Sequence, residues 1–156
     1  MQINEVERRV GITKKNIRFY EQEGLLAPSR QAGNGYRNYS EADVARLEQI
    51  KLLRKLDVPL GEIGQMLAGR LPLAEGMRRH LITLENRQAN LASAQGLATA
   101  LAQEPGLLAD LDAAAHLARM DALEKEGVRF INIQKQDKAR RYRGAALAAA
   151  VFTLLM

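Results

Sequence analysis

Apolar and polar residues in the first 70 positions alternate mostly with the period of amphipathic helices. An apolar stripe over residues 3–10 ends at Gly11, which tolerates the positive φ of a tight turn between helices. The next stripe places Ile17 and Tyr20 on one inward-facing side, and Thr13 supplies a side-chain oxygen that can cap the first turn. The pattern therefore predicts two short helices joined by a tight turn.

A hairpin and two more helices are predicted after this pair. Asn34-Gly35 is the dipeptide best suited to a two-residue hairpin turn with positive φ at both central positions. Ser40 and Asp43 are spaced almost as a capping box at the start of the third helix. Pro59 is expected in the first turn of the fourth. The apolar stripes are predicted to comprise Val44, Leu47, Ile50, Leu52, Leu53 and Leu56 in the third helix and Ile63, Met66 and Leu67 in the fourth.

Basic side chains on the second helix, with aromatic and basic side chains on the hairpin, predict a DNA-binding surface. Guanidinium and aromatic groups on a protruding loop suit sugar, phosphate and the minor groove. Lys14 and Lys15 should mainly contact phosphates, and Tyr20 should support or contact the DNA backbone at the base of the hairpin. The alternative for the tyrosines is packing of their rings on the helices. For Tyr39, DNA contact and packing on the helices are equally expected. The candidate DNA-binding residues are Thr13, Lys14, Lys15, Arg18, Tyr20, Tyr36, Arg37 and Tyr39.

Residues 73–103 carry apolar and small positions at alternating spacings of four and three, which indicates a coiled-coil seam. Few seam residues are large and apolar, so an isolated helix would gain little, whereas two copies could pair closely through Ala and Gln. The alternative is a helix packed on its own head. The predicted dimerisation residues are Met77, Leu81, Leu84, Gln88, Leu91, Gln95 and Ala98, with Ala102 continuing the spacing.

After Pro105-Gly106, residues 107–126 are predicted as another amphipathic helix that ends at Gly127. Its stripe would comprise Leu107, Leu111, Ala114 or Ala115, and Ala118. The simplest interpretation of its acidic residues is a solvent-exposed helix face. A segment of about thirty residues also provides too few apolar side chains to enclose a drug-binding pocket. Residues 104–134 are thus expected to be a small effector or accessory segment.

Composition narrows the range of functions. The 156-residue chain can hold one DNA-binding domain, an arm and little more; its net charge of +5 and pI of about 9.7 suit a polyanionic partner. The chain has no cysteine, which argues against soft-metal or redox sensing, and His80 and His116 lie far apart without ligand-like neighbours. No nucleotide loop, nucleophile with a base, or carboxylate metal cluster is evident, so neither an enzyme nor a bound cofactor is predicted.

The two ends of the chain bear on its location. No secretory signal is evident after Met1, so a cytoplasmic protein is expected. Residues 135–143 are basic and residues 144–156 are apolar but shorter than the roughly 20 residues that span a bilayer. Basic residues before an apolar segment are typical of a cytoplasmic flank, so our hypothesis is a truncated anchor at the inner face of the cytoplasmic membrane. A packed C-terminal helix or a truncated gene is the alternative.

Residues 1–70 resemble the winged-helix DNA-binding domain of the MerR (mercury-resistance regulator) family of bacterial transcription factors. The matching motifs are Ile12-Thr13, Asn16–Glu21, Gly24–Leu26, Pro28, Asn34–Arg37, Tyr39-Ser40, Leu53–Leu56 and Pro59–Ile63. The resemblance implies a mainly α protein: a winged helix-turn-helix head with a β-hairpin wing (1–70), a dimerisation helix (73–103), a small helical region (104–134) and the tail (135–156). We place the boundary after the head at residues 69–76.

The resemblance also implies a mechanism. Family members pair through an antiparallel coiled coil, read palindromic promoters, and bend and untwist the DNA so that RNA polymerase can engage both of its elements; the recognition-helix arginine, Arg18 here, contacts DNA. Those that sense metals use cysteines, which this chain lacks. Two other classes stay open: an architectural or excisionase-like accessory protein, which usually lacks a long arm, and a ligand-binding module with weak DNA affinity. The effector, operator and direction of regulation are not evident from the sequence.

Overall fold

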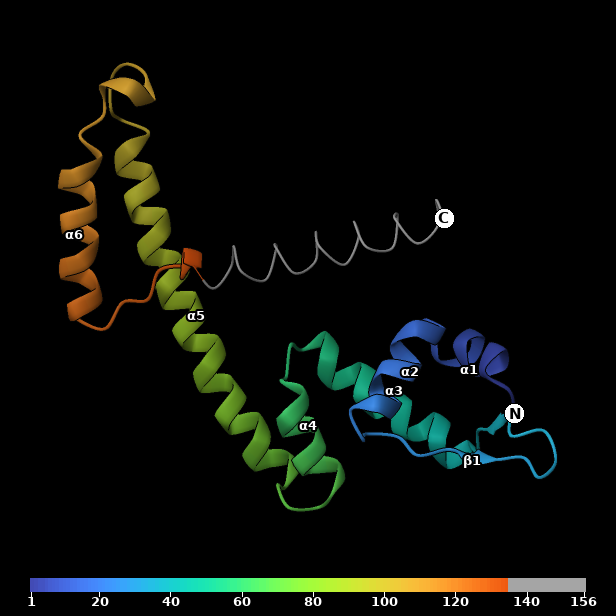
Figure 1. Ribbon diagram of the computed structural model, residues 1–156. Coiled ribbons are helices and arrows are strands. Elements are labelled where there is room, and N and C mark those ends of the chain that lie inside the picture. Colours follow the sequence, from blue (N-terminus) through green and yellow to red (C-terminus); the bar gives the residue numbers. More distant parts are fainter. Residues whose placement is uncertain (135–156) are drawn as a thin grey trace, which may run out of the picture. The chain divides into compact units, whose positions relative to one another are not determined.

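The computed structural model describes residues 1–134, which are mainly helical, with a small antiparallel hairpin and one long helix (Figure 1). This confirms the predicted fold class. Two compact units divide between Thr83 and Leu84. The elements in order are α1 (Ile3–Val10), α2 (Lys14–Gln22), β1 (Ser29–Arg30), β2 (Arg37–Asn38), α3 (Glu41–Lys55), α4 (Leu60–Leu67), α5 (Leu73–Leu101), the 3-10 helix η1 (Leu108–Asp110) and α6 (Ala113–Lys125).

The predicted end of α1 and the predicted starts of α2 and α3 are confirmed, whereas Pro59 is the N-cap before α4 rather than a residue of its first turn. Gly11 ends α1 with φ +72°, and its N–H donates to the Glu7 carbonyl at 2.9 Å. Thr13 caps α2 by accepting from the Asn16 N–H at 3.2 Å. Ser40 and Asp43 form a reciprocal capping box at the start of α3, with distances of 3.1 and 2.8 Å. These local bonds fix the turn that presents α2.

The core of the first unit is apolar and draws on α1, α2, α3 and α4. Its most deeply buried side chains are Val6, Ile17, Tyr39, Leu47, Ile50, Val58 and Ile63. Two cations of α3 serve this core by donating to main-chain carbonyls: Lys51 Nζ to Val10 at 2.8 Å and Arg46 Nε to Leu25 at 2.7 Å. These two hydrogen bonds pair carbonyl oxygens at the end of a helix and in a loop, which would otherwise be buried acceptors without a donor.

The predicted stripe of α3 was too wide. Leu52 is 62% exposed and Leu56 is also exposed. At about 100° per residue, these two positions lie on the opposite side of the helix from Leu47 and Ile50. The buried positions of α3 are Val44, Leu47, Ile50 and Leu53.

The predicted two-residue turn of the hairpin is wrong. Arg30 pairs with Arg37, so the connecting loop comprises residues 31–36. Gly33 and Gly35 have positive φ, whereas Asn34 is not among the positive-φ residues of the described chain. Asn34 instead accepts from the Tyr36 N–H through its side chain at 3.0 Å. This side-chain turn is an alternative that asparagine offers besides the left-handed conformation.

The first turns of α5 pack on the head, so the compact unit extends beyond the boundary expected at residues 69–76. His80 is buried, and its Nε2 lies 2.6 Å from the Leu56 carbonyl oxygen. A Cβ added to Gly76 would lie 2.8 Å from Met66 Sδ and 3.3 Å from Leu71 Cδ2. The glycine therefore allows close approach, and the histidine joins α5 to the end of α3.

In the second unit, α5 from Leu84 onward is followed by η1 and α6. The predicted helix over 107–126 is shorter than expected: it begins at Ala113, where Asp112 accepts from the Ala115 N–H at 3.2 Å. Asp110 accepts from the Leu107 N–H at 3.0 Å, which folds the preceding residues into η1. Of the predicted stripe, Leu111 is half-buried, but Leu107 is 78% exposed and Ala114, Ala115 and Ala118 are exposed, so most of the stripe is wrong. The half-buried residues of α6 are His116, Met120 and Leu123.

Two predictions on the C-terminal part have different outcomes. The break at Pro105-Gly106 and the helix end at Gly127 are confirmed, since Gly106 and Gly127 have φ of +94° and +106°. The proposed membrane anchor, residues 135–156, lies outside the described residues. Within residues 1–134, no helix is both long enough and apolar enough to cross a membrane.

Candidate nucleic-acid interface

Helix α2 has an anchored side and a cationic side. Ile17 and Tyr20 are buried in the core, whereas Lys15 and Arg18 are exposed. Lys14 is half-buried, and its backbone N–H donates to Glu7 Oε2 at 2.7 Å. The buried side thus holds the helix in place while the exposed side presents cations to solvent.

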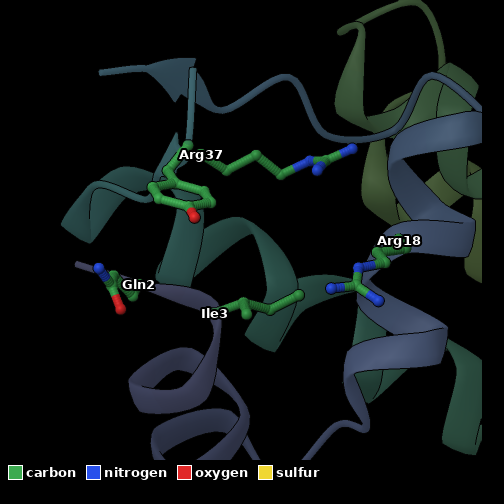
Figure 2. Close-up of a pocket in the computed structure, with 5 residues that line it drawn as sticks. Gln2, Ile3, Arg18 and Arg37 are labelled. Atoms are coloured by element: carbon green, nitrogen blue, oxygen red, sulfur yellow. The ribbon is translucent and has the colours of Figure 1, made fainter. Parts of the chain in front are cut away.

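A cleft of about 380 Å³ separates α2 from the wing, which we define as residues 29–38. It is lined by Gln2, Ile3, Arg18, Tyr36 and Arg37. Figure 2 shows the side chain of Arg37 extending from the wing toward α2, on which Arg18 lies. The structure therefore brings together Arg18 and Arg37, two of the cations predicted to bind DNA, with Tyr36, which is 65% exposed.

Glu21 joins α2 to the wing. Its Oε2 accepts from Arg37 Nε at 2.6 Å, and its Oε1 accepts from the Tyr39 hydroxyl at 2.5 Å. Burial and this hydrogen bond raise the pKa of Tyr39, so its hydroxyl stays protonated and continues to donate. Glu21 was not among the predicted site residues, although its position four residues after Ile17 indicated the inward side of α2.

Two of the predicted DNA contacts require correction. Tyr39 is only 1% exposed and its hydroxyl is paired with Glu21, so its ring packs in the core. Tyr20 is likewise buried in the core, as the inward spacing of α2 predicted. Because both tyrosine rings bury a large apolar area, we assign them to the core rather than to the DNA-binding surface. The backbone N–H of Tyr39 also donates to the Met1 carbonyl at 2.8 Å, which ties the base of the wing to the start of α1.

The predicted dimerisation residues all lie on α5, but they differ in exposure. Leu91 is 69% exposed, and Leu81, Gln88, Gln95 and Ala98 are exposed too. Leu84 is half-buried, whereas Met77 packs against the head core. The first residue of the seam therefore packs within its own chain, whereas most of the other seam residues are exposed to solvent.

The two histidines have ordinary surroundings. His80 contacts a main-chain carbonyl oxygen, as described above, and His116 Nε2 lies 4.0 Å from Glu104 Oε1. Across residues 1–134, no group of three or more His, Cys, Asp or Glu side chains is arranged to hold a metal ion.

A helix-turn-helix with an adjacent wing and exposed cations on both is the arrangement of a DNA-binding domain. Residues 1–70 match the sequence profile described as "MerR HTH family regulatory protein". Residues 1–70 therefore form a MerR-family helix-turn-helix domain.

Several relatives of known name match the same part of the chain. The transcriptional regulator CueR of Salmonella typhimurium is 33% identical over 87 residues, which are 56% of this chain and 60% of the relative. The transcriptional activator TipA of Streptomyces coelicolor is 34% identical over 103 residues, which are 65% of this chain and 39% of the relative. The nodulation protein NolA of a Bradyrhizobium strain is 36% identical over 83 residues, or 53% and 35% of the two chains. The chain thus matches only about a third to three fifths of the length of these relatives.

A solved structure supports the same fold. The lead(II)-bound transcription regulator of Ralstonia metallidurans is 25% identical, with a TM-score of 0.63 over 75% of this chain and 98% of that one. A MerR-family regulator from Bacillus cereus shares the fold with a TM-score of 0.50 at 22% identity, over 94% and 98% of the two chains.

Proposed function

We propose that the chain is a homodimeric, sequence-specific regulator that binds double-stranded promoter DNA through α2 and the wing. The observation that carries this proposal is the cleft between them, lined by Arg18, Arg37 and the exposed Tyr36. A recognition helix in the major groove with a wing on the adjacent backbone uses side chains of these kinds. Cationic side chains supply the sequence-independent part of such binding, because they displace counterions from phosphates.

The second copy is proposed to pair along α5. Leu81, Gln88 and Leu91 present one unpaired side of a 29-residue helix, at the spacing of a coiled-coil seam. Leu91 also borders an open apolar cleft of about 580 Å³, together with Met120 and Phe130. A two-fold pair would cover this apolar surface and present two copies of α2 to a palindromic site.

We propose that the dimer regulates transcription by distorting the promoter rather than by simple occupancy. Bending and untwisting a duplex of promoter length costs several kcal/mol, which phosphate and wing contacts would have to supply. The distortion would bring two promoter elements into register for RNA polymerase. Because promoter DNA is in the bacterial cytoplasm, the protein would act there.

Replacing Arg18 by alanine should weaken DNA binding by about 1 to 3 kcal/mol with little change in the melting temperature, because Arg18 is exposed on α2. The probe is a duplex selected from a random-sequence library by the full-length protein, and affinity is measured by fluorescence anisotropy. Arg119→Ala, an exposed arginine on α6, is the charge-matched control and should bind as the wild type does. Failure to select any duplex, or unchanged affinity of Arg18→Ala, would refute the proposed interface.

Deleting residues 33–35 should lower affinity for the same duplex on the order of tenfold, since wing contacts add to those of the recognition helix. The head should stay folded, because every residue of the 31–36 loop is exposed and Tyr39 remains in the core. Footprinting tests this prediction directly. Protection identical to that of the wild type would show that the wing does not touch DNA.

A further inference from the structure

Glu21 is a half-buried carboxylate beside a surface that is proposed to face DNA. Its side chain is 10% exposed, and both of its oxygens accept hydrogen bonds, one from Arg37 and one from Tyr39. The residue lies in the last turn of α2, and both partners lie on or directly after β2. One carboxylate thus ties the recognition helix to the second strand of the wing.

The charge of Glu21 is unfavourable for DNA binding when taken alone. A carboxylate repels phosphates, and removing it from water costs several kcal/mol unless hydrogen bonds compensate. Here the compensation comes from two groups of the same protein. A role within the protein, rather than a direct contact with DNA, accounts for its presence.

The geometry of the ion pair indicates that role. Arg37 donates to Glu21 through Nε, and a guanidinium has four further N–H donors on its two Nη atoms. A planar guanidinium held at Nε can present these donors to a phosphate in a fixed orientation. The Tyr39 hydroxyl holds the other carboxylate oxygen, which restricts rotation of the carboxylate.

We propose that Glu21 is a positioning residue for DNA binding: it orients Arg37 so that the Nη groups of Arg37, together with Arg18, bind one DNA backbone phosphate in the cleft between α2 and the wing. The inference rests on the proposed DNA-binding function. The ligand is a phosphodiester group, the partner that two guanidinium groups on the wall of one open cleft suit.

The test sets positioning against simple electrostatics. If Glu21 acted only by its charge, Glu21→Ala should tighten binding of the selected duplex. If Glu21 positions Arg37, the same change should weaken binding on the order of tenfold, the loss of about one charge-assisted hydrogen bond. The slope of log affinity against log salt should also fall by about one unit, as it does when a phosphate contact is lost. Glu23→Ala removes an exposed carboxylate at the end of the same helix and should leave binding unchanged or tighter.

A double-mutant cycle tests whether Glu21 acts through Arg37. In the full-length Arg37→Ala protein, adding Glu21→Ala should cause no further weakening, because the side chain that Glu21 positions is already absent. Additive losses, or binding by Glu21→Ala as tight as that of the wild type, would overturn the inference. Should thermal melting show that Glu21→Ala unfolds the head, Glu21→Gln takes its place in the cycle. This variant keeps the shape, and its single amide oxygen can accept from Arg37 only through a neutral, weaker hydrogen bond, so about a threefold loss is expected, again only when Arg37 is present.

The outcomes separate this inference from the proposed function. If Arg18→Ala leaves binding of the selected duplex unchanged, the interface between α2 and the wing is wrong as a whole. If Arg18→Ala weakens binding and Glu21→Ala does not, only the positioning role is rejected.

Discussion

Replacing both Leu84 and Leu91 by glutamate is expected to convert the proposed dimer into monomers and to weaken binding of the selected duplex by more than about 100-fold, because each half-site supplies only part of the contact energy. The two positions lie seven residues apart on the predicted seam of α5, and Leu91 is largely exposed in the single chain. Facing carboxylates would have to lose water in the pair, at a cost of several kcal/mol for each buried charge. Light scattering reports the mass, and anisotropy the affinity.

The matched control places the same charges on another side of α5. Ile82→Glu with Ala89→Glu keeps the seven-residue spacing and alters exposed positions one step after seam residues. This variant should remain dimeric and bind DNA. A wild-type protein that is monomeric at micromolar concentration, or a control as disrupted as the seam variant, would refute pairing along this seam.

Replacing Leu47 by alanine is expected to lower the free energy of unfolding by about 2 to 5 kcal/mol, because the fully buried side chain would leave a cavity. Leu52→Ala makes the same chemical change five residues later on α3, where the side chain is mostly exposed. Its effect should stay within about 0.5 kcal/mol. Urea unfolding followed by circular dichroism measures both. Equal losses in the two variants would contradict the buried side that the structure assigns to α3.

The difference between Leu47 and Leu52 shows what the sequence could predict. Local signals were sufficient where a short-range bond decides the structure, as at Gly11, Thr13 and the Ser40 capping box. The stripe of α3 failed because a helix rich in leucine has apolar residues on more than one side. Only tertiary packing selects the buried side, and Leu52 is left facing solvent.

The wing shows a similar limit for the site. Asn34-Gly35 correctly indicated a hairpin, but its preference for a two-residue turn gave way to a longer loop with an asparagine side-chain bond. The basic residues Arg18 and Arg37 could be selected by type and position. Their relation through Glu21 could not, because it depends on two segments 16 residues apart meeting in space. The hydrogen bond from the Tyr39 hydroxyl to Glu21 likewise could not be predicted, and it places Tyr39 in the core instead of on the DNA-binding surface.

The packing of His80 and Gly76 has a consequence for protein engineering. A sequence-guided chimera would exchange the arm at the glycine-containing residues 69–76, where the sequence predicts the domain boundary. That junction would separate the Leu56 carbonyl from the imidazole that contacts it and would remove the glycine that admits Met66. A donor arm should therefore be joined after Thr83, so that the head carries its own first turns of α5 into the fusion.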